Sequence, residues 1–373
     1  MSIQETLSGI FSGLMTSKTD AYVGIDIGSS SIKVAQLKKD KGRILLETYG
    51  EVALGPYQDK EEGVAGQLTN LEVGVLTEAL KNLLEQANVT AKSGLISVSS
   101  ATSLIFILKV PHIDQRELAG VVENEARKYI PVPLSEVSLD WWVIPERESY
   151  GEEDLGISKK KTEIDVLVAA VRNEVIDRYN TLTKELDFSS VAYEIETFSA
   201  IRGSFKHELS PVMLVDVGAS GIRMTVIEHG VVRKFRALNR GSAFLTSSLE
   251  KSLEIPFEEA ETLKRDVGLD KGHKNQEAYN IINTGLNYVF SEMQNVVIDF
   301  ERDYEKPISK IILTGGGARL PRFKEQVESR YNITTVFADP FSKALSPDFL
   351  DGVLEQAGPE FAIAVGLALQ NLE

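Results

Sequence analysis

The feature of this sequence that most constrains its fold is a short pattern that occurs twice, about 190 residues apart. The first copy, residues 22–37, reads YVGIDIGSSSIKVAQL, and the second, residues 213–227, reads MLVDVGASGIRMTVI. Each copy is an apolar run, an aspartate, a glycine among small residues, and a second apolar run. This arrangement predicts a β-hairpin with a tight Gly- and Ser-containing turn. Because the hairpin recurs, the chain is expected to contain two related halves.

Both turns have the composition of a phosphate-binding loop. The candidate phosphate-binding residues are Gly28, Ser29, Ser30, Ser31 and Lys33 in the first copy, and Gly218, Ala219 and Ser220 in the second. Because glycine has no Cβ, a phosphate can approach the backbone N–H groups of such a turn closely. Two turns of this kind that face each other would hold a nucleoside triphosphate between the two halves.

An aspartate precedes each turn at the same position. Asp26 and Asp216 both stand two residues before the glycine of their turn. A carboxylate at this place can bind a cation, such as Mg²⁺, or its water ligands beside the phosphate. A single Gly/Ser hairpin is usually only a turn, but two hairpins with matching aspartates predict a nucleotide site in which both carboxylates are metal-binding residues.

A second kind of motif is a predicted buried strand, residues 308–313, that is followed closely by three consecutive glycines. The segment IILTGGGARL contains Gly315, Gly316, Gly317 and Arg319 as candidate nucleotide-binding residues. A strand that ends in glycines lets the backbone approach a flat ligand closely, and a tight strand-to-helix corner is the alternative. The segment is not a Walker A loop, because GxxxxGK[ST] does not occur in the chain.

Two more segments carry charged residues that bear on nucleotide chemistry. Glu261 and Lys264 lie three residues apart on a predicted helix, residues 256–267, so they share a face that can reach a ribose or adenine edge. A solvated charged face is the alternative for that pair. Glu196 opens a helical segment after a strand and is the candidate catalytic residue, since it can orient water or a metal ion. A carboxylate at a helix N-terminus also needs no catalytic explanation.

Composition excludes several classes of protein. The formal net charge of −15, with no long basic run, argues against a nucleic-acid partner. The absence of cysteine excludes disulfides, thiol catalysis and Cys-ligated zinc. No stretch is long and apolar enough to span a membrane, and no signal peptide opens the chain, so we expect a cytoplasmic protein.

Residues 1–20 form an N-terminal extension with an amphipathic pattern. Its apolar stripe consists of Ile3, Leu7, Ile10, Phe11, Leu14 and Met15. Helical spacing of these residues favours packing on protein, either this chain or a partner. Binding to a membrane surface and disorder are the alternatives, and the scarcity of basic residues weighs against membrane binding.

The region between the two hairpins contains an apparent insert, residues 104–187. Its predicted elements are strands at 104–110, 137–144 and 163–171, helices at 116–130 and 173–186, and a charged loop at 146–161. The three strands can form a small sheet backed by the first helix. We expect this insert to be the partner-binding element, with Trp141 and Trp142 as possible anchors.

These motifs, in this order, resemble those of the actin, Hsp70 and sugar-kinase superfamily. GIDIGSSSIKVAQL, VDVGASGIRMTVI and IILTGGGARLPRF are similar to its two phosphate loops and its adenosine motif. Within the superfamily the chain resembles the PilM family of type IV pilus assembly proteins. The segments that carry this resemblance are GIDIGSSSIK, VPHIDQRELAGVVENEARKYIPVPLSEVSLDWWVI, AETLKR and FAIAVGLAL.

The resemblance implies an α/β, actin-like ATPase fold with two ribonuclease-H-like lobes. Residues 21–103 would begin lobe I (subdomain 1A), and residues 104–187 would be an SHS2-type insert like subdomain 1C of FtsA. Residues 188–210 would be the connecting segment of lobe I. Residues 211–373 would form lobe II (2A/2B), and their final apolar helix, 361–373, would return to lobe I.

The resemblance also implies a function. The chain would be an ATP- and Mg²⁺-binding cytoplasmic scaffold that docks the N-terminal tail of a PilN-like inner-membrane protein and so reaches the membrane. The tail would lie in a groove between lobe I and the insert, lined by Arg116, Glu123 and Arg127. Self-association stays open. At most slow ATP hydrolysis is expected, because no strong catalytic base accompanies Glu196.

Two other functions remain open at this point. An FtsA-like cell-division filament protein would share the insert, but the C-terminal amphipathic membrane helix typical of FtsA is missing from this sequence. A phosphotransferase of the sugar-kinase branch would need a carboxylate base beside an acceptor pocket, and no such acceptor motif is apparent.

Overall fold

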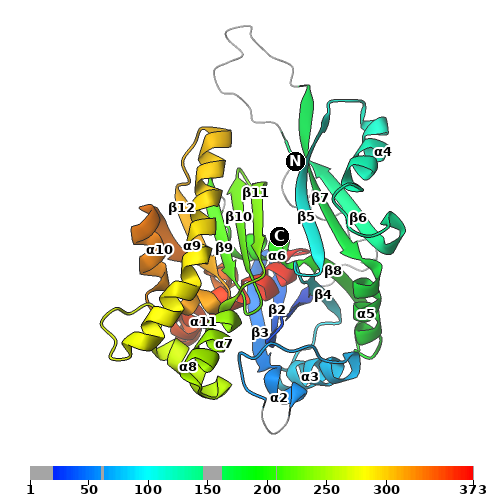
Figure 1. Cartoon of the computed structure of the whole chain (residues 1–373). Helices are drawn as coiled ribbons and strands as arrows, with labels where there is room; N and C mark the ends of the chain where they lie inside the picture. Colours follow the sequence, from blue (N-terminus) through cyan, green and yellow to red (C-terminus); the bar gives the residue numbers. More distant parts are fainter. Residues whose placement is uncertain (1–19, 60–62, 146–161, 207, 373) are drawn as a thin grey trace.

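The computed structural model describes residues 20–59, 63–145, 162–206 and 208–372. These residues form two lobes and a smaller third unit (Figure 1). The apolar stripe predicted within residues 1–20 and the charged loop 146–161 lie outside the described residues.

Lobe I is built on a five-stranded sheet with the order β3-β2-β1-β4-β8. Its strands are β1 (Ala21–Ile27), β2 (Ser31–Asp40), β3 (Arg43–Ala53), β4 (Ser93–Val98) and β8 (Ser190–Ile195). The first three strands form an antiparallel meander, whereas β4 and β8 run parallel to β1. Both β1 and β4 are buried along nearly their whole length, which explains their continuous apolar runs.

Lobe II repeats this sheet with the order β11-β10-β9-β12-β13. Its strands are β9 (Val212–Val217), β10 (Ile222–Glu228), β11 (Val231–Leu238), β12 (Lys310–Thr314) and β13 (Thr334–Phe337). Again three antiparallel strands are followed by two strands parallel to the first. The repeat therefore covers whole sheets and not only the two hairpins. The predicted α/β fold of two related lobes is confirmed.

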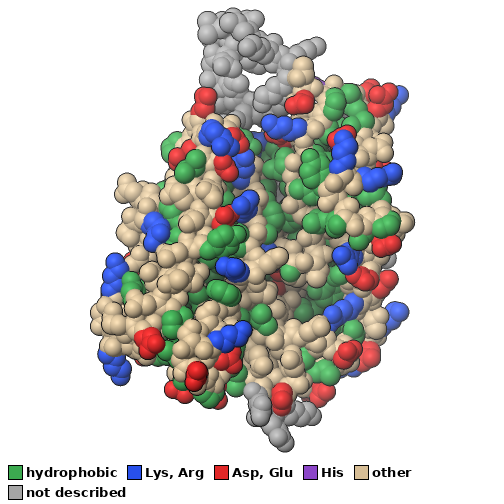
Figure 2. Space-filling model, in the orientation of Figure 1, with side chains coloured by type: hydrophobic (Ala, Val, Ile, Leu, Met, Phe, Trp, Pro, Cys, Tyr) green, Lys and Arg blue, Asp and Glu red, His purple; other side chains and the backbone are tan. Residues whose placement is uncertain are grey.

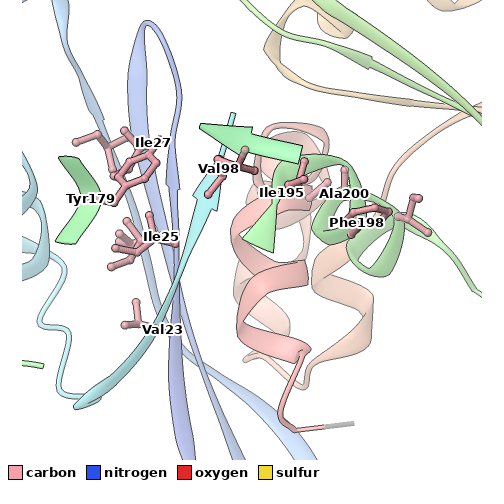
Figure 3. Packing of buried hydrophobic residues seen from close by; sticks show 14 of the residues in the cluster. Val23, Ile25, Ile27, Val98, Tyr179, Ile195, Phe198 and Ala200 are labelled. Atoms are coloured by element: carbon pink, nitrogen blue, oxygen red, sulfur yellow. The ribbon is translucent and has the colours of Figure 1, made fainter. Parts of the chain in front are cut away.

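Helices cover each sheet differently. In lobe I, α3 (Val73–Gln86) and α5 (Asn173–Lys184) pack on one face, and the short α2 (Gly55–Gln58) precedes them. Tyr179 of α5 belongs to the same buried cluster as Ile25 and Ile27 of β1 (Figure 3). In lobe II the helices are α7 (Ser242–Leu253), α8 (Phe257–Val267), α9 (Gln276–Tyr304) and α10 (Phe323–Tyr331). Every helix in the described ranges lacks the length and apolar character that a membrane span requires.

Two helices, α6 (Glu196–Ser204) and α11 (Asp351–Leu369), contact each other almost backbone to backbone. A Cβ at Gly203 would lie 2.0 Å from the Ala362 carbonyl oxygen, and a Cβ at Gly366 would lie 1.9 Å from that of Ser199. Glycine is thus required at both positions. Residues of α6 also contribute to the cluster that contains lobe II residues such as Leu214. This helix pair therefore lies where the two sheets meet.

The final helix begins ten residues earlier than the sequence pattern indicates. The apolar run suggested a start at Phe361, but α11 starts at Asp351 and contains Pro359. The carbonyl of Pro359 accepts hydrogen bonds from the Gly315 N–H and the Thr314 hydroxyl, both at 2.7 Å. Proline disfavours a helix interior because it lacks an N–H donor, and the apolar pattern starts only after Pro359, so the sequence pattern did not indicate the first turns of α11.

The third unit is a three-stranded antiparallel sheet, β5-β7-β6, with one helix packed on it. Its elements are β5 (Ser103–Pro111), α4 (Gln115–Ala126), β6 (Val137–Val143) and β7 (Glu163–Arg172). Its core includes Leu108, Leu118, Val122 and Val166. The side chain of Asp114 caps α4 by accepting a hydrogen bond from the Arg116 N–H. The helix ends four residues before the expected Ile130, in a series of tighter turns.

The two tryptophans of the insert lie in different environments. Trp142 packs edge-on against Phe198 of α6, with ring centroids 5.7 Å apart. Trp141 is half-buried against the insert's own core. One tryptophan therefore ties the insert to lobe I, and the other stabilises the insert itself.

Candidate functional site

A cavity of about 670 Å³ opens between the two lobes. The space-filling view shows a hollow between the two lobes (Figure 2). All the site residues expected from the sequence line it: Asp26, Gly28, Ser29, Ser30, Ser31, Lys33, Glu196, Asp216, Gly218, Ala219, Ser220, Glu261, Lys264, Gly315, Gly316, Gly317 and Arg319. Residues from five separate segments thus converge on one space.

The two turns have the same hydrogen-bonded geometry. The Gly28 N–H donates to the Ser31 carbonyl at 3.0 Å, and the Gly218 N–H donates to the Gly221 carbonyl at 2.9 Å. Neighbouring segments brace both turns, since the Ser29 carbonyl accepts from the Thr69 N–H and the Gly218 carbonyl accepts from the Ser242 N–H. Because each glycine's own N–H closes its turn, a ligand must approach the amides that follow the glycine.

Asp26 is a buried carboxylate and Asp216 a partly buried one, and both have raised pKa values. Burial, opposed by Lys33, raises the pKa of Asp26 to about 6. Burial and the nearby Glu196 carboxylate raise the pKa of Asp216 to about 7. The Ser97 hydroxyl donates to Asp26 at 2.9 Å. These carboxylates lie close enough to repel one another, and a cation placed between them would relieve that repulsion.

A cation stands directly across the hairpin from each aspartate. Lys33 is the register partner of Asp26, and Arg223 is the register partner of Asp216. Residues directly opposite in an antiparallel pair share one face of the sheet. Burial opposes the charge of Lys33, but Glu51, at 2.8 Å, and Asp26 outweigh it and raise its pKa.

Sequence reasoning missed Arg223, although the repeat contains a signal for it. Lys33 follows Asp26 by seven residues, and Arg223 follows Asp216 by the same interval. Glu51 and Glu360 also line the cavity and were not expected. Both come from segments without a motif, so their role depends on tertiary structure alone.

Glu196, the candidate catalytic residue, is held from both lobes. Its carboxylate accepts a hydrogen bond from the Ser100 N–H at 2.9 Å and lies 3.9 Å from Arg223 Nε. It occupies the first turn of α6, where the helix dipole favours a negative charge. The side chain is therefore fixed in place beside the two aspartates.

The pair Glu261 and Lys264 is buried and not a solvated face. Lys264 Nζ donates to Glu261 at 2.6 Å and to the Thr246 hydroxyl at 2.9 Å. Arg265 donates to the second Glu261 oxygen at 2.7 Å. Burial raises the pKa of Glu261, but these partners outweigh it, so the pKa lies below its usual value. The charged-face alternative was wrong, because α8 turns this side toward the cavity.

The three glycines after β12 differ in whether the structure leaves room for a side chain there. Gly315 has φ +82°, and a Cβ there would lie 2.5 Å from an Asp216 carboxylate oxygen. A Cβ at Gly317 would lie 2.6 Å from Val217 Cγ1. A Cβ at Gly316 would meet nothing closer than Glu360, at 3.7 Å. Gly315 and Gly317 thus serve the corner, and only Gly316 leaves open space that a ligand can use.

Two carboxylates, Asp26 and Asp216, line the cleft as candidates for binding a metal ion. Over the part of the chain that the structure describes, no group of three or more His, Asp or Glu side chains is placed to hold one. Asp26 and Asp216 therefore supply at most part of a coordination shell. Such a site fits a cation that also takes ligands from a phosphate or from water.

A second, more open cavity of about 540 Å³ lies between α5 and β8 of lobe I. It is lined from α5 by Asp177, Asn180, Thr181, Thr183 and Lys184, and from the β8 side by Phe188, Ser189, Ser190, Val191 and Tyr193. β8 is the edge strand of the lobe I sheet. Arg116, Glu123 and Arg127, which the sequence suggested for such a groove, are instead exposed around α4 and do not line it.

Two sheets of one topology that share a cleft define an actin-like α/β fold, and a solved structure supports this class. The structure described as "PilM-PilN type IV pilus biogenesis complex" aligns with a TM-score of 0.77 and 21% identity, covering 96% of this chain and 100% of that chain. The sequence also matches the family described as "Type IV pilus assembly protein PilM" over residues 24–372. The chain belongs to this PilM family.

Two other solved structures align more loosely. One is the ethanolamine utilization protein EutJ from Carboxydothermus hydrogenoformans, with 14% identity and a TM-score of 0.49, covering 95% of this chain and 92% of that chain. The other is MreB 5 of Spiroplasma citri bound to AMPPNP, with 11% identity and a TM-score of 0.49, covering 94% and 95%.

Proposed function

We propose that the chain binds ATP with Mg²⁺ in the cleft between the lobes and docks the N-terminal tail of a PilN-like inner-membrane protein. The observation that carries the nucleotide proposal is the convergence of two equivalent turns and two aspartates on one cavity. Wholly or partly buried carboxylates without enough positive charge around them favour a site completed by a ligand that brings a cation.

The arrangement of the cavity suggests how the nucleotide lies. Phosphate oxygens would approach the amides after Gly28 and Gly218, with Lys33 nearby as a counter-charge. The base and ribose would lie toward Gly316, where space is open, and toward the buried pair Glu261 and Lys264. Asp26 and Asp216 would hold Mg²⁺ through its water ligands. The metal would supply charge neutralisation at the phosphates.

The same geometry supports slow hydrolysis. Glu196 is the nearest candidate to orient water, but the Ser100 N–H and Arg223 already hold its carboxylate. Because one oxygen of this carboxylate already accepts the Ser100 N–H, the side chain is less free to turn toward an attacking water. We expect a turnover below about 1 s⁻¹, the low end for typical enzymes.

The open cavity between α5 and β8 supports the docking proposal. β8 pairs with β4 on one side, and its other edge has no neighbouring strand in the sheet as described. An extended peptide can add to such an edge through its backbone while pockets read alternate side chains. The PilN-like tail would place the chain at the inner face of the cytoplasmic membrane. The similar solved structure is described as a PilM–PilN complex, which agrees with this kind of partner.

Calorimetric titration of the full chain with MgATP tests the nucleotide proposal. We expect saturable binding and a raised melting temperature, by mass action. Absence of both would refute it.

Fluorescence anisotropy with a labelled peptide of the partner's N-terminal tail tests the docking site. Thr181→Trp would fill the α5–β8 cavity and should reduce peptide affinity by at least about tenfold, which corresponds to about 1.4 kcal/mol. Glu174→Trp is a matched control, because Glu174 is exposed on the same helix and does not line this cavity. Equal affinity for both variants would show that the tail binds elsewhere.

A further inference from the structure

Arg223 occupies the place in lobe II that Lys33 occupies in lobe I, but its environment is different. Lys33 donates to Ser31 Oγ at 2.7 Å and pairs with Glu51 at 2.8 Å. Arg223 makes only two long hydrogen bonds, from Nη1 to the carbonyls of Ile222 and Leu238, both at 3.3 Å. Lys33 is therefore well satisfied within lobe I, and Arg223 is weakly satisfied within lobe II.

The Nε of Arg223 has no hydrogen-bond partner although it is buried. Arg223 is 5% exposed and lines the cavity. Its nearest carboxylate, Glu196, is 3.9 Å from Nε, which is too long for a hydrogen bond. A buried donor without an acceptor is unfavourable, and an arginine fork that faces a cavity is well suited to a phosphate.

The position of Arg223 indicates which phosphate it would meet. The open space at Gly316 and the pair Glu261 and Lys264 lie at the part of the cavity suited to a nucleoside. Asp26, Asp216 and Glu196 line the same part of the cavity, and Glu196 contributes to the raised pKa of both aspartates, so these carboxylates mark the place where the two hairpins converge. Arg223 stands beside Asp216 and Glu196, at the phosphate end.

We propose that Arg223 binds the terminal phosphate of a nucleoside triphosphate and thereby makes the cleft favour a triphosphate over a diphosphate. The inference rests on the proposed nucleotide function. The guanidinium would exchange its long contact with Glu196 for a charge-assisted hydrogen bond to a phosphate oxygen. A diphosphate does not reach this place, so Arg223 then stays paired with Glu196 across the lobes.

Binding of MgADP and of a non-hydrolysable MgATP analogue, measured by calorimetry on the full chain, tests this role. Arg223→Gln should weaken binding of the triphosphate analogue by about tenfold or more, as expected for one lost charge-assisted hydrogen bond, and binding of ADP by less than about twofold. Arg223→Lys should retain part of the preference. Arg236→Gln removes the same charge from the neighbouring strand β11 at a residue outside the cavity, and it should change neither affinity.

A double-mutant cycle with Glu196→Gln separates direct contact from an effect through Glu196. Direct contact predicts that Arg223→Gln still selectively weakens triphosphate binding when Glu196 is replaced. Loss of that selective effect would make Arg223 only a support for Glu196 and would overturn the proposal. Equal weakening for both nucleotides, or none, would overturn it as well. A wild-type chain that binds neither nucleotide would instead refute the proposed function on which this inference rests.

Discussion

The two lobes have sheets of the same topology. They differ in how completely the charged side chains that line the cleft find partners within their own lobe. In lobe I, Asp26 accepts from Ser97 and its partner Lys33 is paired with Glu51. In lobe II, Asp216 has the higher pKa and its partner Arg223 has an unpaired Nε. The comparison indicates that lobe I is preformed, whereas lobe II holds the groups that a ligand would complete.

The lobes also differ between their fourth and fifth strands. In lobe I the insert and α5 separate β4 from β8, whereas in lobe II the short α10 separates β12 from β13. The strand order is the same in both sheets. The connection between the fourth and fifth strands can thus hold an additional unit without a change in the sheet that borders the cleft. This agrees with a ligand site and a partner site at different places on the molecule.

The largest effect on stability is expected where α11 packs against the sheet of lobe I. A Cβ at Gly24 would lie 1.9 Å from the Ala364 carbonyl oxygen of α11, a backbone atom that cannot move alone. Gly24→Ala should therefore cost about 3 kcal/mol or more of the free energy of unfolding. In lobe II, a Cβ at Gly285 would meet the movable Leu245 Cδ2 at 2.7 Å, so Gly285→Ala should cost about 1 kcal/mol. Urea denaturation measures both, and equal losses would contradict this difference between the lobes.

The second prediction uses the pKa values of the two aspartates. Both folded-state pKa values, about 6 for Asp26 and about 7 for Asp216, are raised above the usual aspartate value of 3.8. The folded protein thus holds protons that the unfolded chain releases. Their stabilisation is fully present below about pH 4 and is lost as pH rises through 6 and then 7.

Urea midpoints of the nucleotide-free protein measure this loss, which amounts to at most about 1.4 kcal/mol for each unit of pKa shift. Asp216→Asn should flatten the decline more than Asp26→Asn, because its shift is larger. An unchanged decline in the double variant would show that other groups cause it.

The third prediction concerns the metal role of the same carboxylates. Asp26→Ala and Asp216→Ala should each reduce the MgATP-induced rise in melting temperature, equivalent to at least about tenfold weaker binding. Removing Mg²⁺ should reduce the rise in the wild type and have little further effect in the double variant. An undiminished rise in both single variants would remove the cation-holding role.

The smallest effect is expected from a substitution that makes lobe I resemble lobe II. Glu51→Gln removes the carboxylate partner of Lys33, which leaves that ammonium free to meet a phosphate, as we propose for Arg223. The pair is partly exposed, so the stability loss should be about 1 kcal/mol or less. Calorimetry should show nucleotide affinity unchanged or raised by a fewfold. A large loss of affinity would mean that Glu51 itself contacts the ligand.

Much of the site could be predicted from the sequence because its chemistry lies in local patterns. The aspartates and glycines belong to turns whose geometry is set within a few residues, and the second copy of the pattern made the first informative. Glu51 and Glu360 could not be found this way, because they reach the cavity only through sheet and helix packing. Arg223 could have been found by comparing the two copies residue by residue.

The fold was predictable at the level of lobes but less so at element boundaries. The expected start of α11 was wrong because the apolar pattern begins only after Pro359, whereas the helix continues through that proline to Asp351. The burial of Glu261 and Lys264 was not decided by sequence, since charges three residues apart occur equally on solvated helices. Such outcomes depend on what packs against an element.

The position of α11 has a consequence for how the chain folds during synthesis. Four of the five strands of lobe I come from the first hundred residues, yet α11, which covers one face of its sheet, is made only after the strands of lobe II. Lys39 of β2 donates to the carbonyl of Leu372, just after α11. All strands of lobe II, by contrast, come from one continuous part of the chain. We therefore expect lobe II to fold while the nascent chain is still attached to the ribosome. Lobe I would wait, with apolar residues such as Leu37 and Leu95 uncovered, until α11 emerges.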